Sequence, residues 1–120
     1  MMSSQQTLQQ RRAAKAWEQT ETVSKQQLSD YSSLVKGLPA QIQTDGLGQT
    51  LAFLLAKAKE KPHHRIAYDF LQEWLSGEFE NVKPGLIEWL LSSDSDVYRQ
   101  ATNEAQAYLV WLKRFAEAKD

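Results

Sequence analysis

Eleven consecutive residues in the middle of the chain, 46–56, carry no charged side chain. The run holds four leucines at the i, i+4, i+7 and i+8 spacing of one helical face: Leu47, Leu51, Leu54 and Leu55. Alanines and Phe53 fill much of the opposite side. A helix that is apolar nearly all round is normally buried, so we expect 46–56 to be the central core helix. Membrane insertion is disfavoured, because a span needs about 20 apolar residues and this run stops at Lys57.

The rest of the chain also favours helix. Apolar residues recur at helical spacing in every longer segment, and no stretch alternates with period two for long enough to form a strand. The expected helices are residues 3–22, 25–36, 46–60, 66–76, 84–91 and 95–117. We therefore predict an all-α fold, one domain over residues 1–120, with residues 1–7 frayed. It should be a bundle of five main helices plus a short helical turn, packed around the buried helix.

Glycine, proline and short polar residues set the expected boundaries. Gly37 is typical of the residue after a helix, and Pro39 should prevent its continuation, so 39–44 is predicted to be a short separate turn. Gly77 should end the following helix, and Pro84 suits the first turn of the next. Residues 92–96 form a polar cluster that should cap the last helix.

The N-terminal helix is expected to dock loosely. Its apolar stripe is thin, with Leu8 and Trp17 as the large members. Arg11, Arg12 and Lys15 lie within about one turn of each other. A solvated face is the favoured interpretation of these three charges, and a contact surface is the alternative.

Composition excludes several classes of protein. The 14 Lys and Arg residues are balanced by 15 Asp and Glu residues, so the net charge of −1 gives no sign of an autonomous nucleic-acid-binding protein. The absence of Cys removes disulfides, thiolate metal sites and a cysteine nucleophile. The first residues lack the apolar segment of a signal peptide, so a cytoplasmic location is expected, with no membrane partner.

No constellation of residues indicates catalysis. The adjacent His63 and His64 lack a third ligand at a suitable spacing, so we expect no metal and assign them to a loop or helix start. No nucleophile motif or phosphate-binding glycine loop occurs, and we expect no cofactor. Three carboxylates are interpreted as a solvated acidic flank: Glu73, Glu78 and Glu80.

Two groups of positive residues are the candidate binding sites. The denser one follows the uncharged run and contains Lys57, Lys59, Lys61 and Arg65. Lysines at a helix end also complement the helix dipole, so a purely structural role is at least equally supported. The sparser group consists of Arg99, Lys113 and Arg114, and Glu104 and Glu117 are expected to neutralise it in part.

Two sequence motifs resemble those of a known family. Residues 38–54 read Leu-Pro-x-x-Ile-x-Thr-x-Gly-Leu-Gly-Gln-Thr-Leu-Ala-Phe-Leu, and residues 95–105 read Ser-Asp-Val-Tyr-Arg-Gln-Ala-Thr-Asn-Glu-Ala. The second is followed at 111–118 by Trp-Leu-Lys-Arg-Phe-Ala-Glu-Ala. These motifs resemble the small α-helical subunit of the type III-B CRISPR (Cmr) RNA-targeting effector complex, and the resemblance extends over most of the chain.

The resemblance implies a structural subunit of a CRISPR antiviral-defence complex, without catalytic activity. Such subunits stack with copies of themselves and with other Cmr subunits, and line the groove where target RNA pairs with guide RNA. RNA binding would be weak for the isolated protein. The alternative is a helical adaptor that binds only protein partners.

The resemblance gives the candidate residues unequal support. Arg99, Lys113 and Arg114 fall on motif positions, whereas the lysines at 57, 59 and 61 are assigned on charge alone. Gly46 and Gly48 should permit a bend and close packing at the start of the central helix. The next two residues, Gln49 and Thr50, are expected to act as caps or internal hydrogen-bond partners.

Overall fold

The computed structural model describes residues 5–120, and these fold into six α-helices without a strand. The helices are α1 (Leu8–Glu21), α2 (Lys25–Asp45), α3 (Leu47–Ala58), α4 (Pro62–Glu78), α5 (Leu86–Ser92) and α6 (Ser95–Lys119). The predicted all-α bundle is confirmed. The predicted short helix near 84–91 is α5, with seven residues, whereas the predicted separate turn at 39–44 is part of α2.

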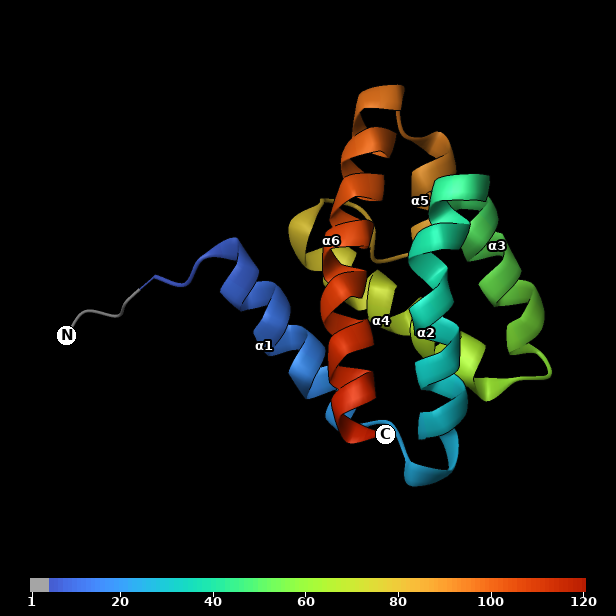
Figure 1. Cartoon of the computed structure of the whole chain (residues 1–120). Helices are drawn as coiled ribbons and strands as arrows, with labels where there is room; N and C mark the ends of the chain where they lie inside the picture. Colours follow the sequence, from blue (N-terminus) through green and yellow to red (C-terminus); the bar gives the residue numbers. More distant parts are fainter. Residues whose placement is uncertain (1–4) are drawn as a thin grey trace.

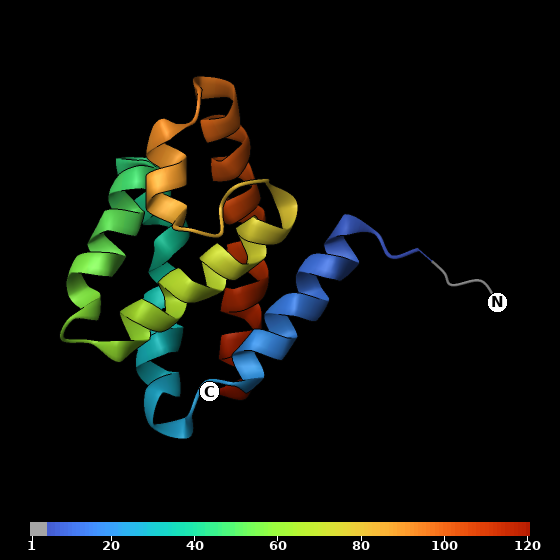
Figure 2. The ribbon, with the colours of Figure 1, turned by 180° about the vertical axis from the view of Figure 1, so that it is seen from behind.

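Helix α4 lies at the centre of the arrangement, because it contacts each of the other five helices. Helices α2 and α6 run antiparallel beside each other, with α3 on the far side of α2 and α1 on the far side of α6 (Figure 1). The opposite view shows α4 crossing in front of this pair, with α5 above it (Figure 2). Among the described helices, none is both long and apolar enough to cross a membrane.

The position of α3 differs from the expected central post. The helix buries Leu47, Thr50, Leu51 and Leu54, but Ala52 and Ala56 on its other side are exposed. Alanine side chains offer little apolar area, so leaving them in water costs little free energy. The uncharged run therefore supplies one wall of the core. The centre is occupied by α4, which buries six residues where α3 buries four.

Helix α2 does not stop at Gly37 as predicted. It passes through Pro39 to Asp45 and is 21 residues long in all. Proline leaves the carbonyl four residues earlier without its usual donor, a cost that is offset here by burial of Leu38 and Ile42 on the core stripe. In addition, the carbonyl of Pro39 accepts a hydrogen bond of 2.9 Å from the Gln106 amide of α6. Tertiary packing thus overrides the local stop signal.

Gly46 caps the end of α2. Its φ of +88° suits glycine, and its N–H donates a hydrogen bond to the carbonyl of Ile42 at 2.8 Å. The close packing expected at Gly48 is confirmed, because its N–H donates a hydrogen bond to the hydroxyl of Tyr98 at 2.8 Å. A Cβ at this position would lie 3.0 Å from the same oxygen. Thr50 donates internally to the Gly46 carbonyl at 2.9 Å, whereas Gln49 is exposed.

Two boundaries that glycine and proline were expected to set also differ from the sequence prediction. Helix α4 continues past Gly77 to Glu78, and Pro84 lies in the turn before α5 instead of in its first helical turn. The predicted cap of the last helix is confirmed, because Asp94 accepts the N–H of Val97 at 2.9 Å.

The course of α2 makes a testable prediction about its glycines. Gly37→Ala should raise the free energy of unfolding by about 0.5–1 kcal/mol, because the position is helical and nothing lies within 4 Å of an added Cβ. Gly46→Ala is the matched control and should lower stability, because φ there is +88°. Urea unfolding midpoints measure both. Destabilisation by Gly37→Ala would contradict the continuous helix.

Candidate nucleic-acid interface

The first group of positive residues surrounds the junction between α3 and α4. Lys57 lies in the last turn of α3, Lys59 is its C-cap residue, Lys61 is the N-cap residue of α4, and Arg65 follows in the first turns of α4. All four residues are exposed. Sequence reasoning therefore placed this group correctly on the surface.

Most of these cations lack a partner in the fold. Within residues 5–120, no carboxylate pairs with Lys57, Lys59 or Lys61. Arg65 is different, because it pairs with Asp69 at 3.1 Å and its guanidinium lies 5.5 Å from the ring centre of Tyr68. The three lysines are thus the more available members of the group.

The helix dipole explains only part of this group. Lys57 and Lys59 lie at the C-terminal end of α3, where positive charge is favourable. Lys61 lies at the N-terminal end of α4, where positive charge is unfavourable, and the first turn of α4 contains no acidic residue. No side chain caps this end, so the first N–H groups of α4 and the lysines together favour an anion there.

The histidine pair lies in the first turn of α4, in agreement with the expected helix start. The rings of His63 and His64 are neighbours, with centres 4.5 Å apart. His64 is buried edge-on against Phe53. Burial and the nearby positive groups hold the pKa of His64 below its usual value, so the ring is neutral at pH 7.

The second group lies along the outward face of α6. Arg99 is in its N-terminal third, and Lys113 and Arg114 follow 14 and 15 residues later, about 21 Å along the axis. Arg99 pairs with Asp96 at 2.6 Å, and Arg114 approaches Glu117 at 4.0 Å. Such exposed pairs contribute little free energy, so both arginines can exchange their partner for a phosphate.

The fold does not bring the two groups together. Helix α2 packs against both α3 and α6 and lies between them, so the junction lysines and the α6 cations are on separate parts of the surface (Figures 1 and 2). An RNA strand that touched both groups would have to cross α2 or α4, because α4 also contacts both α3 and α6.

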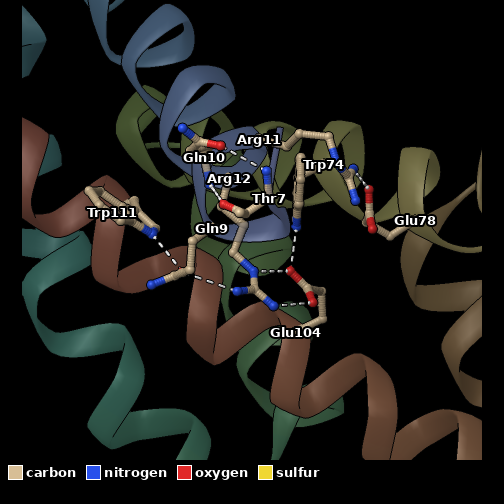
Figure 3. A network of polar contacts seen from close by, with 9 residues as sticks. All are labelled: Thr7, Gln9, Gln10, Arg11, Arg12, Trp74, Glu78, Glu104 and Trp111. Carbon is tan, nitrogen blue, oxygen red and sulfur yellow. Dashed lines mark hydrogen bonds and ion pairs between the residues drawn. The ribbon is translucent and has the colours of Figure 1, made fainter. Parts of the chain in front are cut away.

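The N-terminal positive cluster is an intramolecular clamp, which sequence reasoning did not identify. Arg12 donates to both oxygens of Glu104 on α6, at 2.7 and 2.8 Å, and Trp74 of α4 donates to the same carboxylate at 2.9 Å (Figure 3). Arg11 pairs with Glu78 at 2.9 Å. The expected loose docking of α1 is wrong, because directional polar contacts attach it to two other helices.

Further contacts complete this attachment. Lys15 pairs with Glu73 at 2.9 Å, and the same carboxylate accepts the amide of the buried Gln19 at 2.8 Å. Gln19 in turn accepts a hydrogen bond from the buried hydroxyl of Tyr108. The acidic flank at 73 and 78 is therefore paired with α1, and Glu104 neutralises Arg12 instead of the cations on α6.

These contacts shift the ionisation of two carboxyl groups. Burial opposes ionisation of Glu104, but the hydrogen bonds from Arg12 and Trp74 outweigh it and hold the pKa of Glu104 below its usual value. Hydrogen bonds from Gln19 and Lys15 likewise lower the pKa of Glu73. Both carboxylates therefore stabilise the folded state at neutral pH.

The clamp also forms one side of a groove. A cavity of about 410 Å³ lies between α1 and α6. It is lined by Gln9, Arg12, Ala107, Val110, Trp111 and Arg114. Gln9 links its two sides, because its amide oxygen accepts hydrogen bonds from Trp111 at 3.2 Å and Arg12 at 3.1 Å (Figure 3).

The clamp makes the stability of the protein pH-dependent in a defined direction. Because the folded pKa of Glu104 is lowered, its stabilisation is complete above the unfolded value of about 4.5 and is lost as pH falls through the folded pKa. Glu104→Gln should cost about 2 kcal/mol at pH 7 and progressively less below pH 4.5. Urea unfolding between pH 3 and 7 measures this difference.

The matched control is Glu117→Gln, whose exposed carboxylate only approaches Arg114. The free energy of unfolding of this variant should stay within about 0.5 kcal/mol of the parent's across the same pH range. Equal losses at pH 3 and pH 7 for Glu104→Gln would show that its ionisation does not stabilise the fold.

Comparison with known proteins gives one consistent result. Residues 8–119 match the family model described as "CRISPR-associated protein (Cas_Cmr5)". A curated relative from Thermotoga maritima, the "CRISPR system Cmr subunit Cmr5", is 33% identical over 100 residues, which cover 81% of this chain and 72% of the relative.

The solved structures agree with this match. A crystal structure of a CRISPR-associated Cmr5 family protein from Thermus thermophilus superimposes with a TM-score of 0.79 and 28% identity. The match covers 94% of this chain and 97% of that one. From the family match over nearly the whole chain, the sequence relative and the shared fold, it follows that this chain belongs to the Cmr5 family, the small subunit of the type III-B Cmr CRISPR complex.

Proposed function

We propose that this chain is a non-catalytic structural subunit that lines the channel holding guide RNA and target RNA in the Cmr complex. It stacks there with copies of itself and with neighbouring subunits. Membership of the Cmr5 family supports the assignment to the complex. The contact with RNA is the finer part of the proposal and rests on the two groups of exposed cations.

The observation that carries the RNA contact is the junction between α3 and α4. Three lysines surround it, and no carboxylate in the described part of the chain pairs with them. They lie beside a helix start that has neither a capping side chain nor an acidic first turn. Both features favour phosphate over a neutral or basic partner.

The α6 cations supply the second contact. Arg99, Lys113 and Arg114 share the outward face of one helix and extend over about 21 Å. Arg65 belongs with the junction lysines, but its guanidinium is held by Asp69 and by the ring of Tyr68 together, so it contributes less. Contacts of this kind bind the RNA backbone without reading its sequence.

A protein of net charge −1 binds RNA weakly through a few such contacts. Stacked copies present the same contacts repeatedly along one strand, which raises the effective concentration and hence the overall affinity. This explains how a neutral subunit contributes to RNA binding in the assembled complex.

The alternative is an adaptor that binds only protein partners. Its support is apolar exposure, because Leu91 and Val110 retain 70% and 51% of their accessible surface. Val110 lies with Ala107 and Trp111 in the groove between α1 and α6, and contiguous exposed apolar surface marks protein interfaces. The two functions differ in whether removal of the cations changes RNA affinity.

The decisive experiment measures target-RNA affinity against salt for complexes rebuilt with variant subunits. Replacing Lys57, Lys59 and Lys61 together with Gln should flatten the logarithmic salt slope by up to about 2, at roughly 0.7 for each phosphate that is no longer neutralised. The triple replacement of Arg99, Lys113 and Arg114 should act in the same direction. Adding Arg65→Gln to the first variant should give a smaller further change.

The matched control removes three other exposed lysines, Lys25, Lys36 and Lys83. It changes net charge equally but should leave the slope within error, because these residues belong to neither group. If both test triples behave like this control in complexes that still assemble, the RNA contact is wrong and the adaptor function is the better one.

A further inference from the structure

A polar cavity lies beside the lysines of the α3–α4 junction. It has a volume of about 310 Å³ and is bounded by the N-terminal half of α2 on one side and by the α3–α4 turn on the other. Figures 1 and 2 both show this turn beside the first turns of α2. The side chains that line the cavity come from both elements: Gln27, Asp30, Glu60, Lys61, Pro62 and His63. The cavity therefore adjoins the surface proposed to hold phosphate and shares Lys61 with it.

The cavity carries charges of both signs that the fold leaves unpaired. Asp30 and Glu60 are exposed, and within residues 5–120 neither carboxylate pairs with a cationic group. Lys61, on the opposite side of the cavity from Asp30, has no carboxylate partner in the same part of the chain. Separated charges of both signs fit a ligand that has both an anionic group and a hydrogen-bond donor.

The two sides of the cavity favour different parts of such a ligand. On the α4 side, Lys61 precedes Pro62, which has no N–H, so the N–H of His63 is the first that the helix can offer to an anion. On the α2 side, Gln27 and Asp30 are three residues apart and are therefore neighbours on one helix face. An ionised carboxylate is only an acceptor, so Asp30 repels phosphate and requires a donor.

Within a nucleic-acid strand, the donor that fits these requirements is the ribose 2′-hydroxyl. It accompanies every phosphate of RNA, it is missing from DNA, and it does not depend on the base. Carboxylates bind ribose hydroxyls in the same way in dinucleotide-binding proteins. A divalent cation is a poorer match, because among residues 5–120 no three potential ligands are placed to hold a metal ion.

We propose that Asp30 accepts a hydrogen bond from the 2′-hydroxyl of a ribonucleotide whose phosphate lies against Lys61 and the start of α4. This proposal rests on the proposed contact between the junction lysines and RNA, and it adds a means of distinguishing RNA from DNA. Asp30 makes the contact in preference to Glu60, because Asp30 lies within a regular helix and Glu60 lies in a turn. The lysines supply affinity, and Asp30 supplies selectivity for the sugar.

A carboxylate in this role has an effect opposite in sign to that of its charge alone. Removing a carboxylate that only repels phosphate strengthens the binding of RNA and DNA equally. Removing one that accepts the 2′-hydroxyl weakens the binding of RNA relative to DNA. The ratio of the two affinities is therefore the informative quantity, because the general effect of charge cancels in it.

The experiment uses the full-length chain and short oligouridines of equal length with ribose, 2′-deoxyribose or 2′-O-methylribose. The 2′-O-methyl strand keeps the oxygen but has no proton to donate. Each strand is titrated at low salt, where weak phosphate contacts are measurable, and dissociation constants are taken from the NMR shifts of the Lys61 and His63 amides. The ribose strand should bind about fivefold more tightly than each of the other two, the effect expected of one hydrogen bond.

Asp30→Ala should abolish this preference while keeping the helix intact, because alanine is the best helix former. The matched control is Asp45→Ala, which removes the same charge from the same helix about 22 Å along its axis and should keep the preference. A preference that survives in Asp30→Ala overturns the proposal, and so do equal affinities of the parent for all three strands. A 2′-O-methyl strand that binds like the ribose strand also overturns it, because the donor would then be irrelevant.

These outcomes are separable from the RNA contact itself. Replacing Lys57, Lys59 and Lys61 together with Gln should weaken the binding of all three strands. Equal, salt-dependent binding of the three strands by the parent refutes the ribose contact alone. An absence of binding, or binding that the lysine triple leaves unchanged, refutes the junction as an RNA surface and with it the contact at Asp30.

Discussion

The carboxylate of Glu104 holds three helices in one arrangement. It lies on α6, receives a forked pair of hydrogen bonds from Arg12 of α1 and accepts the indole N–H of Trp74 from α4. An ionised group that is largely removed from water is costly unless its hydrogen-bonding capacity is met, and here three donors meet it. The stacking of Trp74 on Tyr108, with ring centres 4.8 Å apart, lies beneath the same junction. This attachment helps to fix α1 against α6 and so to form the groove between the two helices.

The all-α class, the cap at Asp94 and the extent of α6 were predictable because they depend on local pattern and short-range chemistry. The course of α2 was not, because Gly37 and Pro39 are stop signals locally, whereas their tolerance depends on burial of Leu38 and Ile42 against distant helices. The role of α3 illustrates the same limit. An uncharged run predicts contact with the core, but whether one face or all faces are covered depends on where the larger side chains of the other helices lie.

For the candidate site, sequence was a good guide to exposure and a poor guide to pairing. All members of the two predicted groups lie at or near the surface, as expected. Which cations are already neutralised depends on contacts between residues far apart in the chain, such as Arg12 with Glu104 across 92 positions. The pattern of ion pairs also separates the available lysines at the α3–α4 junction from Arg65 and from the α1 cluster. Hydrophobic periodicity in the sequence cannot predict which charges form these pairs.

The polar attachment of α1 has a consequence for how the sequence can change. Apolar contacts tolerate a shifted or resized neighbour, whereas a forked guanidinium–carboxylate pair needs both members at one distance and angle. A change at position 12 therefore leaves a largely buried charge at 104 without its counter-charge, and the converse holds equally. Positions 11 and 78, and positions 15 and 73, are related in the same way, though they are more exposed. Among members of the family, the charges at these three pairs should be inherited or lost together, as a record of how α1 is attached.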